Sequence, residues 1–108
     1  MTIKKLYKKY YRKKKAIRPR KSSRNFDDPQ YKAWRKSVYQ RDDYTCQMCH
    51  KAKKRLQAHH ILMWSKYPQQ RYNIANGITL CLKCHKLVRN KEDYYVKQFL
   101  SIVSSKNV

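Results

Sequence analysis

The sequence predicts a small α+β domain in which two β-strands are flanked by helices, preceded by a basic N-terminal arm. Three observations lead to this prediction: two short strand-like segments, helical spacing of apolar residues on both sides of them, and two C-x-x-C pairs. A chain of 108 residues has room for one compact domain. We therefore assign residues 1–25 to the arm and residues 26–108 to the domain.

The N-terminal arm is strongly basic. The chain holds 28 Lys or Arg residues against 6 Asp or Glu residues, for a net charge of +22, and residues 1–24 contain no acidic residue. Because a block of like charge repels itself, we expect an arm that is disordered on its own and binds nucleic-acid phosphates. A solubilising tail is the alternative interpretation. The candidate phosphate contacts are Lys4, Lys5, Lys8, Lys9, Arg12, Lys13, Lys14, Lys15, Arg18, Arg20, Lys21 and Arg24.

The first helix is expected directly after the arm. Asp28 is a suitable N-cap residue, and Pro29 favours the first helical turn. Tyr31, Trp34 and Val38 then follow at i, i+3 and i+7, which places them on one helical face.

Two strands and two further helices are expected in the rest of the chain. Residues 56–61 and 78–81 are the strand candidates. The segment between them is expected to be a polar loop, in which Pro68 and Asn76-Gly77 are typical of turns. A helix should begin near Leu82. A last helix is expected where one face carries Tyr95, Val96, Phe99, Leu100 and Val103.

The four cysteines predict a structural metal site. They form the pairs Cys46-Gln-Met-Cys49 and Cys81-Leu-Lys-Cys84, separated by 31 residues. Two such pairs complete a tetrahedron of soft thiolate ligands, which favours one Zn²⁺ per chain. A domain of this size commonly needs such support for its core. Each pair is followed by histidine, as in haem c attachment, but we expect no export signal of the kind that haem attachment requires.

The segment that contains the cysteine pairs offers histidines in place of carboxylates. No Asp or Glu occurs from Tyr44 to Lys91, which excludes a two-metal nuclease built on carboxylates in this segment. His59 and His60 end the first candidate strand, so their side chains should lie on opposite sides of it. One of them is then a candidate metal ligand and the other faces a substrate. Two surface histidines on a basic patch are the alternative.

Four motifs follow one another between Phe26 and Val103: Trp34-Arg35, RDDYTCQMC at 41–49, LQAHHI at 56–61 and NGITLCLKCH at 76–85. Through them, the sequence from Phe26 to Val103 resembles the HNH endonucleases, the zinc-bearing branch of the ββα-metal (His-Me finger) nucleases, common in phages and mobile introns. The step of 16 residues from His60 to Asn76 and the step of 9 residues from Asn76 to His85 are similar to the family pattern.

The resemblance implies a metal-dependent endonuclease that hydrolyses phosphodiester bonds in double-stranded DNA. It implies that His59 and His85 hold a catalytic divalent ion, Mg²⁺ or another. It also implies that His60 is the general base and that Asn76 braces the loop that orients it. These roles agree with simple chemistry, because a neutral imidazole with a pKa of about 6.5 takes up a proton near neutral pH.

The sequence departs from the family at two positions. Arg89 stands where some members carry a further histidine, and Asn73 stands where an acidic residue is frequent, three residues before Asn76. Asn90, one residue further on, is a candidate replacement for the missing histidine.

The charge and the cysteines also fit a function without catalysis. A catalytically inactive, zinc-stabilised module that binds DNA or RNA would show the same charge and cysteines, although such a module has no need for the full set of histidines and asparagine. The basic N-terminus is followed by no apolar segment, so we expect no secretory signal and a reducing compartment, the cytoplasm, or that of the host cell for a phage protein. One active site per chain predicts a single-strand nick unless two chains cooperate.

Overall fold

The computed structural model describes residues 3, 25–52 and 55–106. Of the expected arm, only Ile3 and Asn25 fall in these ranges, so the twelve basic residues assigned to phosphate contacts lie outside the described residues.

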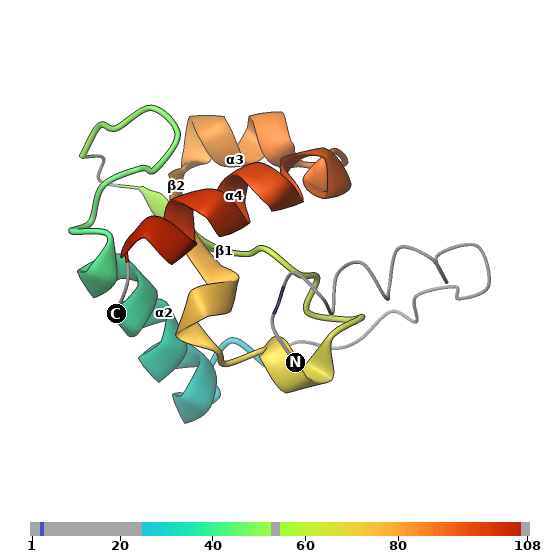
Figure 1. Cartoon of the computed structure of the whole chain (residues 1–108). Helices are drawn as coiled ribbons and strands as arrows, with labels where there is room; N and C mark the ends of the chain where they lie inside the picture. Colours follow the sequence, from blue (N-terminus) through green and yellow to red (C-terminus); the bar gives the residue numbers. More distant parts are fainter. Residues whose placement is uncertain (1–2, 4–24, 53–54, 107–108) are drawn as a thin grey trace.

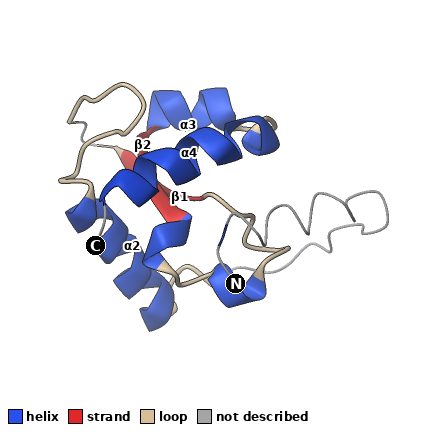
Figure 2. Ribbon diagram, viewed as in Figure 1, coloured by secondary structure: helices blue, strands red, loops and turns tan. Residues whose placement is uncertain are grey.

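Two strands and three helices form the described part of the chain (Figures 1 and 2). No helix within it is long and apolar enough to cross a membrane. In chain order the elements are α2 (Pro29–Arg41), β1 (Leu56–His60), the 3-10 turns η2 (Pro68–Gln70) and η3 (Ile74–Asn76), β2 (Gly77–Cys81), α3 (Leu82–Val88) and α4 (Glu92–Lys106).

Helix α2 begins as its sequence predicts. The Asp28 side chain accepts a hydrogen bond of 2.9 Å from the backbone N–H of Gln30, and Pro29 is the first helical residue. Trp34 and Val38 are buried on the predicted face. Local capping chemistry therefore fixes where the helix starts, and apolar spacing fixes which side faces the core.

The strands β1 and β2 form an antiparallel hairpin at the centre of the domain. The register pairs Leu56 with Cys81 at one end and His60 with Gly77 at the other. Helix α2 covers one face of the hairpin, and α3 and α4 cover the other (Figure 1). Because α3 begins at the residue after β2, the unit is a ββα hairpin and helix, which confirms the predicted fold class.

The connection between the strands differs from the polar loop that the sequence predicts. Ile61, Leu62, Trp64 and Tyr67 are buried in it. The Asn76-Gly77 pair is also not a tight hairpin turn, because Asn76 ends η3 and Gly77 begins β2. The reason is that the connection folds back onto the hairpin and adds apolar side chains to the core.

The hydrophobic core lies between the hairpin and α4. Ile78 and Leu80 of β2 are completely buried, and Val96, Phe99 and Val103 of α4 cover them from the predicted apolar face. Full burial of side chains of this size contributes about 1.5–3 kcal/mol each.

Gly77 allows α2 to pack closely against β2. Its φ of −119° is open to any residue, so flexibility is not what the position requires. A Cβ atom there would collide with Val38 Cγ2 and would lie 2.7 Å from Trp34 Cζ2. The position is therefore restricted by space.

A buried carboxylate joins the end of α2 to the hairpin. Asp42 Oδ2 lies 2.8 Å from Arg41 Nη2 and accepts a hydrogen bond of 2.9 Å from the backbone N–H of Thr79. The same Arg41 nitrogen donates to the carbonyl of Gly77 at 2.7 Å. Each charged group thus has a charged or backbone partner, which is the condition under which buried charges are tolerated.

Candidate active site

The four cysteines converge, as their spacing predicts. The Sγ atoms of Cys46, Cys49, Cys81 and Cys84 all lie within 4.8 Å of one another, and those of Cys49 and Cys81 are 3.8 Å apart. Zn–S distances of about 2.3 Å in a tetrahedron place sulfur atoms about 3.8 Å apart. A disulfide would need about 2.05 Å, so these are free thiols. The donor set therefore fits a structural Zn²⁺.

Each cysteine pair belongs to a different part of the fold. Cys46 and Cys49 lie in the turn after α2, which is tied to β2 by a hydrogen bond of 3.0 Å from the Gln47 N–H to the Thr79 carbonyl. Cys81 ends β2 and is the N-cap of α3, where its Sγ accepts from the Cys84 N–H at 3.4 Å. An ion held by all four would join the turn, the hairpin and the helix.

The thiols differ in acidity. Burial raises the pKa of Cys46, but hydrogen bonds from backbone groups at Cys49, Cys81 and Met48 outweigh it and lower the pKa to about 7. Burial is the main cause of the raised pKa of Cys84, and the neighbouring thiols raise it further. Since zinc binds thiolates, its uptake must displace the Cys84 proton.

A second group of residues lines a cleft of about 450 Å³ beside β1 and α3. His59 and His60 reach it from β1, and His85 reaches it from α3. Arg89 and Glu92, which follow α3, also line it. The three histidines singled out in the sequence are thus brought together.

His60 is held by an aromatic side chain and a backbone carbonyl. Its ring stacks on Trp34, with centroids 3.9 Å apart and planes 8° apart. Its Nε2 atom lies 2.9 Å from the carbonyl oxygen of Arg71. Because a carbonyl only accepts hydrogen bonds, Nε2 carries the proton, and Nδ1 is the basic nitrogen of the neutral ring.

Asn76 is fully buried and joins the two ends of the connection between the strands. Its Oδ1 accepts from the Leu62 N–H at 2.7 Å, and its Nδ2 donates to the carbonyls of Leu62 and Gln70 at 3.2 and 3.0 Å. Asn76 is not among the residues that line the cleft. Its hydrogen bonds fix the backbone that follows His60. Asn76 is therefore placed to orient His60 and not to contact a substrate in the cleft.

His59 and His85 lie on the opposite side of the hairpin from Trp34. Their ring centroids are 5.7 Å apart, and His59 packs edge-on against Phe99. Burial lowers the pKa of His85, the charge of Arg89 lowers it further, and Glu92 partly opposes this. A neutral imidazole is the form that binds metal ions, so both the position and the protonation of His85 suit a ligand.

Arg89, Asn90 and Asn73 belong to the part of the sequence that departs from the family pattern, and each has a distinct place in the structure. Asn90 is exposed with a φ of 68° and does not line the cleft, whereas Arg89 does. Asn73 accepts a hydrogen bond from the Ala75 N–H and, through its carbonyl, one of 2.8 Å from Trp34 Nε1.

Two features of the site were missed in the sequence. Glu92 supplies a carboxylate to the cleft, and it lies one residue beyond the acid-free segment. Trp34 stacks on His60 across 26 positions of the chain. Helical spacing indicates that Trp34 is buried but does not indicate its partner.

The hairpin, the following helix and the four-cysteine cluster form a small ββα domain whose cysteines fit a zinc ion, and the histidine-lined cleft lies beside β1 and α3. Residues 46–91 match the model of the family described as HNH endonuclease. This chain therefore contains an HNH endonuclease family domain, which extends from the first cysteine to three residues beyond α3. Membership in this family indicates nuclease activity on a nucleic acid. Neither a search of curated proteins nor a search of solved structures gives a match.

Proposed function

We propose that this protein is a metal-dependent endonuclease that hydrolyses phosphodiester bonds in double-stranded DNA, of the phage or mobile-element type. The observation that carries the proposal is the support of His60, stacked on Trp34 and bonded to the Arg71 carbonyl, in the cleft that His59 and His85 also line. A base oriented before the substrate arrives costs no reordering during the reaction.

His60 acts as the general base in this proposal. Its Nδ1 atom takes a proton from the water that attacks phosphorus, while Nε2 stays bonded to the Arg71 carbonyl. General-base catalysis of this kind is typically worth ~10²–10⁴ in rate. The Arg89 side chain in the same cleft supplies positive charge to the phosphate.

His59 and His85 would hold the catalytic divalent ion. When bound, the ion supplies Lewis-acid stabilisation of the phosphate and of the leaving oxygen. Two imidazoles leave positions open for substrate, and imidazole ligands favour a transition-metal ion over Mg²⁺. The Glu92 carboxylate in the cleft is of the ligand type that Mg²⁺ prefers, so its presence keeps Mg²⁺ compatible with the site.

The rest of the chain supports DNA binding and stability. The basic residues of 1–25 contact phosphates, and residues 26–108 form the nuclease domain with its zinc cluster. The net charge of +22 suits a polyanionic partner. Reduced thiols at the cluster suit the cytoplasm, including that of a host cell.

Nicking of a supercoiled plasmid tests the proposal. The wild-type protein with added divalent ion should nick the plasmid, and His60→Ala should lower cleavage by about 10²-fold or more without loss of zinc or DNA affinity. His50→Asn is the matched control, because His50 is an exposed histidine outside the cleft and asparagine tolerates its φ of 61°. Tight DNA binding without nicking by the wild type would favour the inactive binding module, and a fully active, folded His60→Ala protein would remove His60 as the base.

A further inference from the structure

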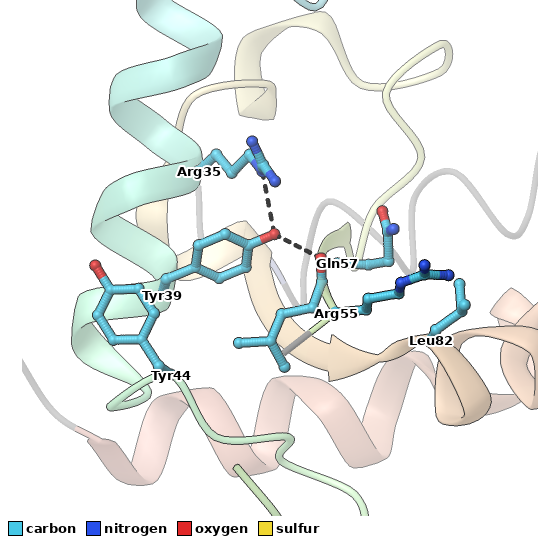
Figure 3. Close-up of a pocket in the computed structure, with 7 residues that line it drawn as sticks. Arg35, Tyr39, Tyr44, Arg55, Gln57 and Leu82 are labelled. Atoms are coloured by element: carbon cyan, nitrogen blue, oxygen red, sulfur yellow. Dashed lines mark hydrogen bonds between the residues drawn. The ribbon is translucent and has the colours of Figure 1, made fainter. Parts of the chain in front are cut away.

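A second pocket, separate from the histidine cleft, lies between α2 and β1. Its volume is about 590 Å³. Arg35 and Tyr39 line it from α2, Arg55 lies just before β1, and Gln57 lies on β1 (Figure 3). Of the seven described residues that line it, two are arginines and none is acidic. The pocket is therefore positively charged.

Arg35 is held in place by a buried tyrosine. Its Nε donates to the Tyr39 hydroxyl at 3.1 Å, and that hydroxyl donates to the Leu56 carbonyl at 2.9 Å (Figure 3). Its guanidinium carbon lies 5.2 Å from the centre of the Tyr39 ring. Because Nε is bonded to tyrosine, the terminal nitrogens of the guanidinium are oriented for a further acceptor.

The lining chemistry favours a phosphate. Guanidinium groups bind phosphate oxygens with paired, charge-assisted hydrogen bonds, and arginine is preferred for this task. The Gln57 amide adds a neutral donor, and the exposed ring of Tyr44 at the edge can contact a sugar or a base. A pocket of about 590 Å³ takes a nucleotide unit more readily than an isolated anion.

The pocket adjoins the histidine cleft. Gln57 lines both, and it precedes His60 by three residues on β1. Three residues of an extended strand span roughly 10 Å. One nucleic-acid strand is thus able to occupy the cleft and the pocket together.

We propose that this pocket, formed by Arg35, Arg55 and Gln57, binds a backbone phosphate of the DNA next to the phosphate that is cut. The inference rests on the proposed nuclease function, which it extends by a specific anchoring subsite. It assigns part of the phosphate binding to the folded domain, in addition to the N-terminal arm.

The test compares two double variants that each lose two positive charges. Arg35→Ala/Arg55→Ala alters the pocket, and Lys36→Ala/Lys97→Ala removes two exposed lysines that line neither the pocket nor the cleft. Binding to a labelled duplex is measured at several salt concentrations by fluorescence anisotropy, with zinc-loaded protein and no added catalytic ion. Folding is checked by zinc content and circular dichroism.

The pocket variant should show a weaker salt dependence than the lysine control. Each lost phosphate contact lowers the slope of log K against log salt by about 0.9, which equals about 3.5-fold in affinity between ~50 and ~200 mM salt. Tyr39→Phe, which removes only the hydroxyl that holds Arg35, should shift the slope in the same direction by less. In cleavage assays the pocket variant should raise KM more than it lowers kcat.

An affinity and slope equal to those of the lysine control would overturn the subsite, as would a fall in kcat with unchanged affinity. Because the binding measurement requires no cleavage, it is independent of the nuclease proposal. A wild-type protein that binds but does not nick DNA would contradict the nuclease function. The salt slopes of the two double variants would still show whether the pocket binds a phosphate.

Discussion

The two ends of the β1–β2 hairpin are held by different means. At the end where Leu56 pairs with Cys81, the adjoining turn buries only Cys46 and Gln47 among residues 43–52, so thiols replace a hydrophobic core. At the end where His60 pairs with Gly77, packed and hydrogen-bonded side chains surround the His60 ring.

This difference separates stability from catalysis. We expect the cysteine end to depend on a metal ion for its rigidity, because little apolar surface is buried there. The histidine end is oriented by the protein itself, so His60, the proposed general base, does not depend on a metal ion for its position. We therefore expect variants at the cysteine end to lose mainly unfolding free energy, and variants around His60 to lose catalytic rate as well.

The largest loss is expected at the cysteine end. Cys81→Ser should release the zinc and unfold the domain, since binding energies of roughly 10–16 kcal/mol in structural zinc sites are folding energy. Zinc content by elemental analysis and thermal unfolding followed by circular dichroism measure this. His50→Asn, next to the first pair but outside the cluster, should keep both. A Cys81→Ser protein as stable as the wild type would contradict a structural zinc.

Asn76→Ala should give the next largest loss. It leaves a buried N–H of Leu62 and two carbonyls without their side-chain partner, at a cost of about 1–3 kcal/mol for each unsatisfied group. Asn73→Ala is the matched control, because Asn73 is exposed in the same connection and should cost about 1 kcal/mol. Urea unfolding measures both variants. Equal losses would show that the Asn76 hydrogen bonds do not hold the connection.

Trp34→Phe should destabilise less but should affect catalysis. Phenylalanine keeps a ring near His60 and loses the 2.8 Å hydrogen bond to the Asn73 carbonyl, for about 1–2 kcal/mol. Trp34→Leu removes the stack as well. We expect kcat to fall more in Trp34→Leu than in Trp34→Phe, with KM and zinc content little changed in both. An unchanged kcat in folded Trp34→Leu would show that the stack does not position His60.

Deletion of residues 1–24 should have the smallest effect on stability, because Ile3, the one described residue among them, is a partly buried side chain packed against the core. The domain's unfolding midpoint should change little, while binding to all DNA sequences should weaken, most at low salt. If six of the twelve charges engage phosphates, the slope of log K against log salt should fall by roughly five. Target and random duplexes measured at several salt concentrations check this. An unchanged slope would argue against phosphate contacts, and loss of preference for one sequence would indicate that the arm reads bases.

The sequence predicts those parts of the structure that depend on local chemistry. Asp28 and Pro29 mark the start of α2, and the C-x-x-C spacing of the two cysteine pairs predicts that the four thiols meet at one site. Strand ends agree within one residue. Partners far apart in the chain could not be predicted, since spacing reports which side chains are buried but not what they meet. The Trp34–His60 stack is one example, and the tie between Asp42 and Thr79 is another.

The same limit applies to the candidate site. The family pattern places the histidines and Asn76 by their spacing alone, and the structure brings the histidines into one cleft. Glu92 belongs to no sequence motif, because it is the turn between α3 and α4 that brings this first residue of α4 to the cleft. The pocket brings together Arg35 on α2 and Arg55 just before β1, which lie 20 positions apart in the sequence.

The single glycine of the chain has a consequence for how relatives of this protein vary. Since a Cβ at Gly77 would collide with Trp34 and Val38, a larger residue there requires a smaller one on α2. The side chain that would have to give way includes the ring beneath His60. In an alignment of relatives, we therefore expect tryptophan at position 34 to coincide with glycine at position 77, and substitutions at the two positions to be correlated.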